Sequence, residues 1–71
     1  MPYYKNIDNP IYWDITENTI LKYTVDEHEK IAVKRYTYGH GFAATVRSWS
    51  KKISLSEFMK FVEKNSKQHN N

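Results

Sequence analysis

The sequence predicts an α+β fold in which a small antiparallel β-sheet of about four strands, arranged as two hairpins, carries one C-terminal α-helix packed on one face. Apolar and polar residues alternate over residues 11–16 and 19–25, whereas apolar positions in residues 55–64 recur at helical spacing. A chain of 71 residues has room for one hydrophobic core. We therefore expect a single compact domain over residues 1–65, followed by a frayed polar tail at residues 66–71.

Residues 11–25 are expected to form the first hairpin. A register that unites the apolar sides of its two strands pairs Ile15 with Leu21, Trp13 with Tyr23 and Ile11 with Val25, and sets Asp14 against Lys22 on the other face. This register centres the connection on Asn18. Residues 19–29 also fit helical spacing, but their β-branched residues favour a strand.

A second hairpin is expected from residues 30–38 and 42–50, after the polar break at residues 26–29. The tripeptide Gly39-His40-Gly41 lies between these two β-rich runs, and its glycines supply the positive φ that tight loops need. Neither face of this hairpin is cleanly apolar. A bulge would exchange its two faces, so its register and its solvent face stay open.

The helix start is the clearest local signal in the chain. Ser54 as N-cap places Glu57 at the third helical position, which completes a capping box. The expected buried face consists of Leu55, Phe58, Met59 and Val62, with Phe61 flanking it, and the helix should end near Asn65.

Composition excludes several classes of site. The chain has no cysteine, so it forms neither a disulfide framework nor a thiolate zinc site. It contains no phosphate loop, dinucleotide fingerprint or nucleophile elbow, and no motif identifies a protein family. We expect no enzymatic activity, no cofactor and no metal. The first twenty residues resemble no signal peptide, and no run approaches the ~18 apolar residues of a membrane span, so we expect a cytoplasmic protein with no membrane partner.

Charge is strongly segregated along the chain, although the net charge is only +3. Residues 30–56 contain six basic residues and no acid, whereas residues 1–29 contain six acids and two lysines. Lysine and arginine neutralise phosphates, and aromatic faces stack on bases. The expected binding surface for a protein partner or a nucleic acid is this basic, aromatic segment, with Lys34, Arg35, Tyr36, Tyr38, His40, Arg47, Trp49, Lys51 and Lys52 as its candidate residues. An ordinary solvated sheet face is the alternative interpretation.

The histidines give weaker signals. His40, between two glycines, has no ligand or catalytic partner at useful spacing, which favours a solvated turn residue. His28 lies among carboxylates, but their spacing lacks the pattern of an EF-hand loop.

Two functional hypotheses remain. The first is a small protein-binding module, an adaptor or inhibitor that docks on a larger protein through its charged and aromatic surface. The second is a nucleic-acid-binding protein that uses the basic segment 30–52. The sequence does not identify the partner or the oligomeric state.

Overall fold

The computed structural model describes residues 3–66. Within them the chain forms five strands and two helices in the order β1 (Tyr3–Asn6), β2 (Tyr12–Ile15), β3 (Thr19–Val25), β4 (Ile31–Thr37), α1 (His40–Trp49), β5 (Ser50–Lys52) and α2 (Leu55–Ser66). The strands build one antiparallel sheet with the order β4-β3-β2-β1-β5. The α+β class with an antiparallel sheet is confirmed, with one strand and one helix more than the sequence predicts.

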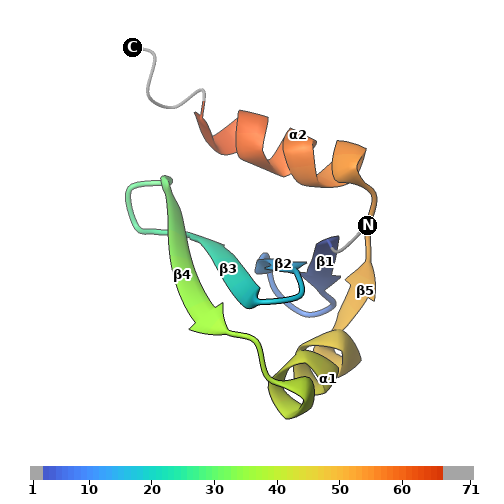
Figure 1. The fold of residues 1–71 in the computed structure, drawn as a ribbon. Helices are drawn as coiled ribbons and strands as arrows, with labels where there is room; N and C mark the ends of the chain where they lie inside the picture. The colour runs from blue at the N-terminus through green and yellow to red at the C-terminus, as the bar shows by residue number, and fades with distance from the viewer. Residues whose placement is uncertain (1–2, 67–71) are drawn as a thin grey trace.

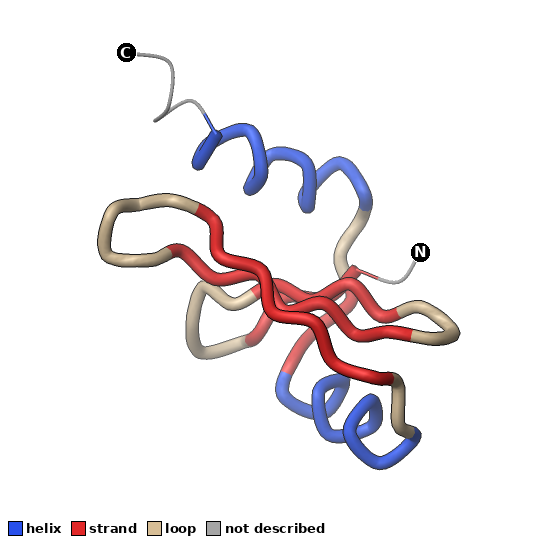
Figure 2. The backbone as a smooth tube through the Cα atoms, turned by 60° about the vertical axis from the view of Figure 1, so that its left-hand side comes forward, coloured by secondary structure: helices blue, strands red, loops and turns tan. Residues whose placement is uncertain are grey.

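The two helices lie on opposite sides of the sheet, as Figures 1 and 2 show. Helix α1 connects β4 at one edge of the sheet to β5 at the other edge. Four strand spacings of about 4.8 Å separate these edges by about 19 Å, and a helix of ten residues is about 15 Å long. This connection therefore requires α1 to run across the strands.

The prediction of a second hairpin at residues 30–50 is wrong in its second half, because residues 40–49 are helical. Gly39 is the N-cap in an extended conformation (φ −146°, ψ 136°), and neither glycine has a positive φ. The apolar residues Phe42, Ala43 and Val46 recur at helical spacing, and Ala43 and Val46 are fully buried. Burial of this stripe on the sheet outweighs the tendency of the glycines to form a tight loop.

Strand β1 was not predicted. It pairs with β2 on one side and with β5 on the other, so that Asn6 lies opposite Ser50. The first strand and the last strand of the chain thereby lie side by side, with β5 at the edge of the sheet. Backbone hydrogen bonds from Ile7 N–H to the Trp49 carbonyl (3.0 Å) and from Ile53 N–H to the Tyr3 carbonyl (2.9 Å) extend this contact beyond the strands.

The β2–β3 hairpin is confirmed, but its register is shifted by one residue. Ile15 pairs with Ile20 and not with Leu21, because a two-residue connection at 17–18 joins Thr16 to Thr19. The Thr16 N–H donates to the Thr19 carbonyl (2.9 Å), and the two threonine hydroxyls lie 3.0 Å apart. A shift of one residue exchanges the faces of a strand.

This shift separates the predicted Asp14–Lys22 pair. Lys22 now lies opposite Trp13 on the α1 face, and Asp14 lies opposite Leu21 on the α2 face. One carboxylate oxygen of Asp14 is buried and has no hydrogen-bond partner among the described residues. Burial consequently raises the pKa of the Asp14 carboxyl.

Residues 26–30 connect β3 to β4 and form the turn of a longer hairpin. The Asp26 carboxylate accepts backbone hydrogen bonds from His28 (2.8 Å) and Lys30 (3.0 Å). These bonds, with that of Lys30 the larger cause, lower the pKa of Asp26. Glu29 has a φ of 60°, which is a left-handed conformation that glycine adopts with less strain.

Helix α2 begins where the capping box predicts. The Glu57 N–H donates to the Ser54 hydroxyl (3.1 Å), which confirms Ser54 as the N-cap. The buried face of the helix differs from the prediction: Phe58 and Phe61 are buried, whereas Leu55 and Met59 are 41% and 43% exposed. The helix ends at Ser66, and the rest of the predicted tail lies outside the described residues.

Aromatic rings join α2 to the sheet, which explains why Phe61 is central to its packing. Phe61 stacks on Tyr12 (ring centroids 3.9 Å apart), and Phe58 stacks on Tyr3 (4.5 Å) and meets Tyr23 edge-on (5.0 Å). Alternate positions of β1, β2 and β3 supply these tyrosines. Neither helix in residues 3–66 has the length and apolar character required to span a membrane.

Candidate binding groove

The nine residues predicted as a binding surface do not form one patch. Strand alternation places Lys34 and Tyr36 of β4 on the α1 face of the sheet and Arg35 on the α2 face. Likewise, Lys51 and Lys52 of β5 point to opposite faces. The other four lie in the β4–α1 connection or on α1: Tyr38, His40, Arg47 and Trp49. The basic residues are therefore distributed over both sides of the molecule.

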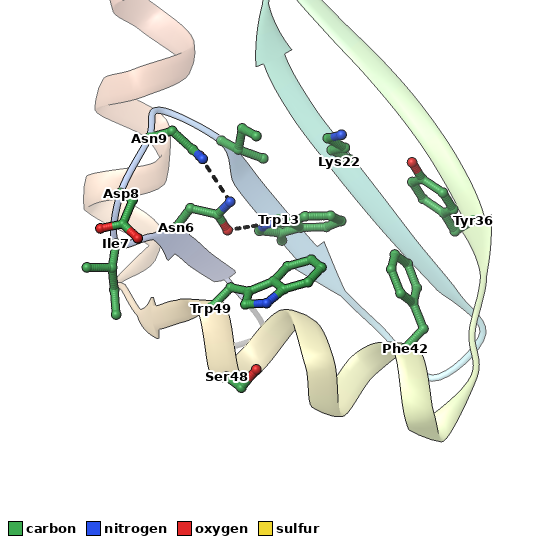
Figure 3. Close-up of a pocket in the computed structure, with 11 residues that line it drawn as sticks. Asn6, Ile7, Asp8, Asn9, Trp13, Lys22, Tyr36, Phe42, Ser48 and Trp49 are labelled. Atoms are coloured by element: carbon green, nitrogen blue, oxygen red, sulfur yellow. Dashed lines mark hydrogen bonds between the residues drawn. The ribbon is translucent and has the colours of Figure 1, made fainter.

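A groove of about 650 Å³ lies on the α1 face (Figure 3). Its lining comes from the β1–β2 loop, from β2, β3 and β4, and from both ends of α1. Two of the predicted residues, Tyr36 and Trp49, line it. The rest of the lining includes Asn6, Ile7, Asp8, Trp13, Lys22 and Phe42.

Trp13 forms the floor of the groove and is held by a buried hydrogen bond. Its indole N–H donates to the Asn6 side-chain oxygen at 2.7 Å, and Asn6 is itself 8% exposed. The same oxygen accepts from the Ser50 hydroxyl (3.3 Å), and the Asn6 amide donates to Asn9 (3.0 Å). Asn6 thus ties together β2, the β1–β2 loop and the start of β5.

Aromatic rings form one wall. Tyr36 and Phe42 have ring centroids 5.0 Å apart, and Phe42 meets Trp13 edge-on at 6.0 Å. The opposite rim consists of Ile7 and Trp49, which are 65% and 52% exposed. Figure 3 shows the Trp49 indole beside that of Trp13, with Phe42 and Tyr36 on the far side. The groove therefore presents rigid apolar surface whose rim is open to solvent.

Two lysines follow the aromatic wall. The Lys22 ammonium lies 5.9 Å from the ring centroid of Trp13, and the Lys34 ammonium lies 5.4 Å from that of Tyr36. These are cation–π distances. In the part of the chain that the structure describes, neither ammonium group lies within 4.0 Å of a carboxylate.

Arg47 is engaged away from the groove. Its guanidinium lies 6.0 Å from the Tyr4 ring centroid, and the hydroxyls of Tyr4 and Tyr38 raise its pKa further. It borders a shallower hollow with Ile15 and Glu17. Both Arg47 and Arg35 are exposed, as expected for arginines that are not paired within a core.

Sequence reasoning missed most of the groove. The Asn6-Ile7-Asp8-Asn9-Pro10 segment is typical of a turn and could have been read as the connection of a further hairpin. The sequence placed Trp13 on the apolar side of the first hairpin and indicated no role for it at a surface. Phe42 was assigned to a strand, where its neighbours would have been different.

Titratable side chains do not assemble a metal site in residues 3–66, where no group of three or more His, Asp or Glu residues converges. Comparison of the chain with protein-family models, with curated proteins and with solved structures finds no match. The geometry of the groove is therefore the basis for a functional proposal.

Proposed function

We propose that this protein is a small, non-catalytic binding module, an adaptor or inhibitor, that docks on a larger protein through the aromatic groove. The observation that carries the proposal is the exposure of Ile7 and Trp49 beside a groove with a rigid aromatic wall. Large apolar side chains that stay exposed at the rim of a concave surface are typical of interaction sites. We also propose that the protein acts in the cytoplasm.

The groove has the features of a binding hot spot. Protein interfaces concentrate their energy in a few tryptophan, tyrosine and arginine side chains within a desolvated centre. The Trp13 indole is held by its hydrogen bond to Asn6, and the main chain of Trp49 is held by the bond from Ile7 N–H to the Trp49 carbonyl. A partner side chain that enters the groove therefore meets a floor that is already ordered, which lowers the entropy cost of association.

The distribution of charged side chains favours a protein over a nucleic acid as the partner. A nucleic-acid backbone requires several cations along one track. Here Arg35 and Lys51 point away from the face that carries Lys34 and Lys52. Asp8 adds a carboxylate to the groove itself. A rim of mixed charge around an apolar centre corresponds to the anatomy of protein interfaces.

A random-peptide phage library selected on the immobilised protein tests the proposal. We expect enriched peptides to share a large apolar or aromatic residue. Trp49→Ala should weaken their binding by at least 2 kcal/mol, or about 30-fold. Leu55→Ala, which removes an exposed apolar side chain on α2, is the matched control and should leave binding unchanged.

Chemical-shift mapping of a synthetic peptide should locate the complex at Trp13, Tyr36 and Trp49. Peptides that bind Trp49→Ala as tightly as the native protein would refute the proposal. If oligonucleotides bind instead, with an affinity that falls steeply with salt, the nucleic-acid hypothesis is the correct one.

A further inference from the structure

The two lysines beside the groove form an unusual pair. Lys22 of β3 and Lys34 of β4 are direct cross-strand neighbours in the register of the sheet. Directly opposed residues of an antiparallel pair project to the same face, with Cα atoms about 4.5–5.5 Å apart. Like charges in this arrangement are destabilising. The fold thus places two lysines opposite each other on one face of the sheet, with one ammonium group over the Trp13 ring and the other over the Tyr36 ring.

The pair is continuous with the groove. Lys22 lines the groove together with Trp13 and Tyr36, and Lys34 lies over the ring of Tyr36. Figure 3 shows Lys22 on the side opposite to Ile7 and Asp8. A ligand anchored between the aromatic rings consequently has the lysine pair at one end and the Asp8 carboxylate at the other.

We propose that the partner segment is acidic: an aromatic or large apolar side chain fills the groove, and carboxylates next to it in the partner's sequence bridge Lys22 and Lys34. This inference rests on the proposed function and names the chemistry of its partner. A carboxylate placed between the two ammonium groups replaces their repulsion with two charge-assisted hydrogen bonds. Asp8 disfavours an acidic residue on the other side of the anchor, which gives the bound segment a direction.

The peptide selection distinguishes this inference from the proposed function. Peptides enriched on the native protein should carry Asp or Glu on one side of the aromatic residue. On the double variant Lys22→Met, Lys34→Met, the aromatic preference should persist and the acidic preference should disappear. Methionine keeps an apolar stem of similar length, and Lys51→Met on the α2 face is the control for loss of positive charge.

Affinities of one synthetic peptide provide the quantitative test. Replacement of its carboxylates by amides should weaken binding to the native protein at least about tenfold, and should change binding to the double variant less than about twofold. Circular dichroism checks that the variant is folded. Lys34 is exposed, so Lys34→Met alone carries the test if the double variant does not fold.

Each outcome has a definite meaning. Aromatic peptides without acidic residues, still dependent on Trp49, would refute the acidic partner and leave the docking proposal intact. Failure to enrich any Trp49-dependent peptide would refute both proposals. Equal losses from amidation in the native protein and the double variant would show that the carboxylates bind elsewhere. Phosphate-rich oligonucleotides that displace the peptide, and bind without it, would assign the lysine pair to a nucleic acid.

Discussion

Asn6 provides the sharpest test of how the fold holds the groove. Replacing Asn6 with Ala removes the acceptor of the Trp13 indole N–H, which is buried and has this hydrogen bond at 2.7 Å. A buried donor that loses its partner costs about 1–3 kcal/mol. The Ser50 hydroxyl, which lies 3.3 Å from the same oxygen, keeps its shorter hydrogen bond to the Val46 carbonyl. We therefore expect a loss of about 1–3 kcal/mol, a large part of the stability of a domain of this size.

The assay is urea unfolding followed by tryptophan fluorescence in a Trp49→Phe background, which leaves Trp13 as the single tryptophan. In a thermal melt of the same variants, a loss of 2 kcal/mol should lower Tm by roughly 8–16 °C. Asn9→Ala is the matched control: it removes the exposed partner of the Asn6 amide and should cost less than about 0.5 kcal/mol.

Trp13→Phe completes a double-mutant cycle, since it removes the indole N–H but keeps an aromatic ring. Because Trp13→Phe also removes the tryptophan signal, urea unfolding of all four variants of the cycle is followed by far-UV circular dichroism. Asn6→Ala should cost much less in that background than in the native chain. If Asn6→Ala is as stable as the native protein, or if its cost is the same in both backgrounds, the Asn6–Trp13 bond does not hold the floor of the groove.

Three further predictions test other elements. Ser54→Ala should cost about 1 kcal/mol in urea unfolding and Ser56→Ala much less, because Ser54 caps α2; equal costs would place the cap elsewhere. Glu29→Gly should raise Tm and stabilise the protein by about 0.5–1 kcal/mol, since it relieves a left-handed conformation; a lower Tm would contradict this. Asp14 has a raised pKa, so the folded state binds its proton more tightly than the unfolded chain, and its contribution to stability is lost as the pH rises above about 4. Urea midpoints should therefore show Asp14→Asn gaining stability relative to the native protein between pH 3.5 and 7, and a constant difference would refute the assignment.

Sequence patterns predicted the helices and strands that depend on interactions between residues close in sequence. The Ser54 cap lies within three residues of its partner, and the β3 and β4 strands follow from β-branched content. The same approach failed at residues 40–49. There, alternation with period 2 and helical spacing are both compatible with Phe42 and Val46, and the sheet surface that decides between them is built from distant residues.

The groove could not be predicted from the sequence because it depends on the long-range pairing of β1 with β5. Asn6 and Ser50 are 44 positions apart, and no local pattern indicates that β1 and β5 are neighbours. The groove depends on this pairing because Trp49 immediately precedes β5 and Ile7 immediately follows β1. The sequence could therefore identify Trp49 and Tyr36 as exposed aromatic candidates but could not bring Trp13 or Lys22 to the same place.

The pairing of β1 with β5 also couples partner binding to the stability of the fold. Asn6 fixes the floor of the groove, and the backbone bond between Ile7 and Trp49 joins the two segments that carry its rim, so contacts between these distant parts of the chain position the binding surface. A partner in the groove binds the folded protein and not the unfolded chain, and at 100 times its Kd it adds about 2.7 kcal/mol to the stability of the folded state. Asn6→Ala should consequently weaken both folding and binding. Ser54→Ala lowers stability at a helix cap outside the groove, which leaves the affinity of the folded protein unchanged. A loss of affinity confined to Asn6→Ala would thus separate damage to the groove from general destabilisation of the fold.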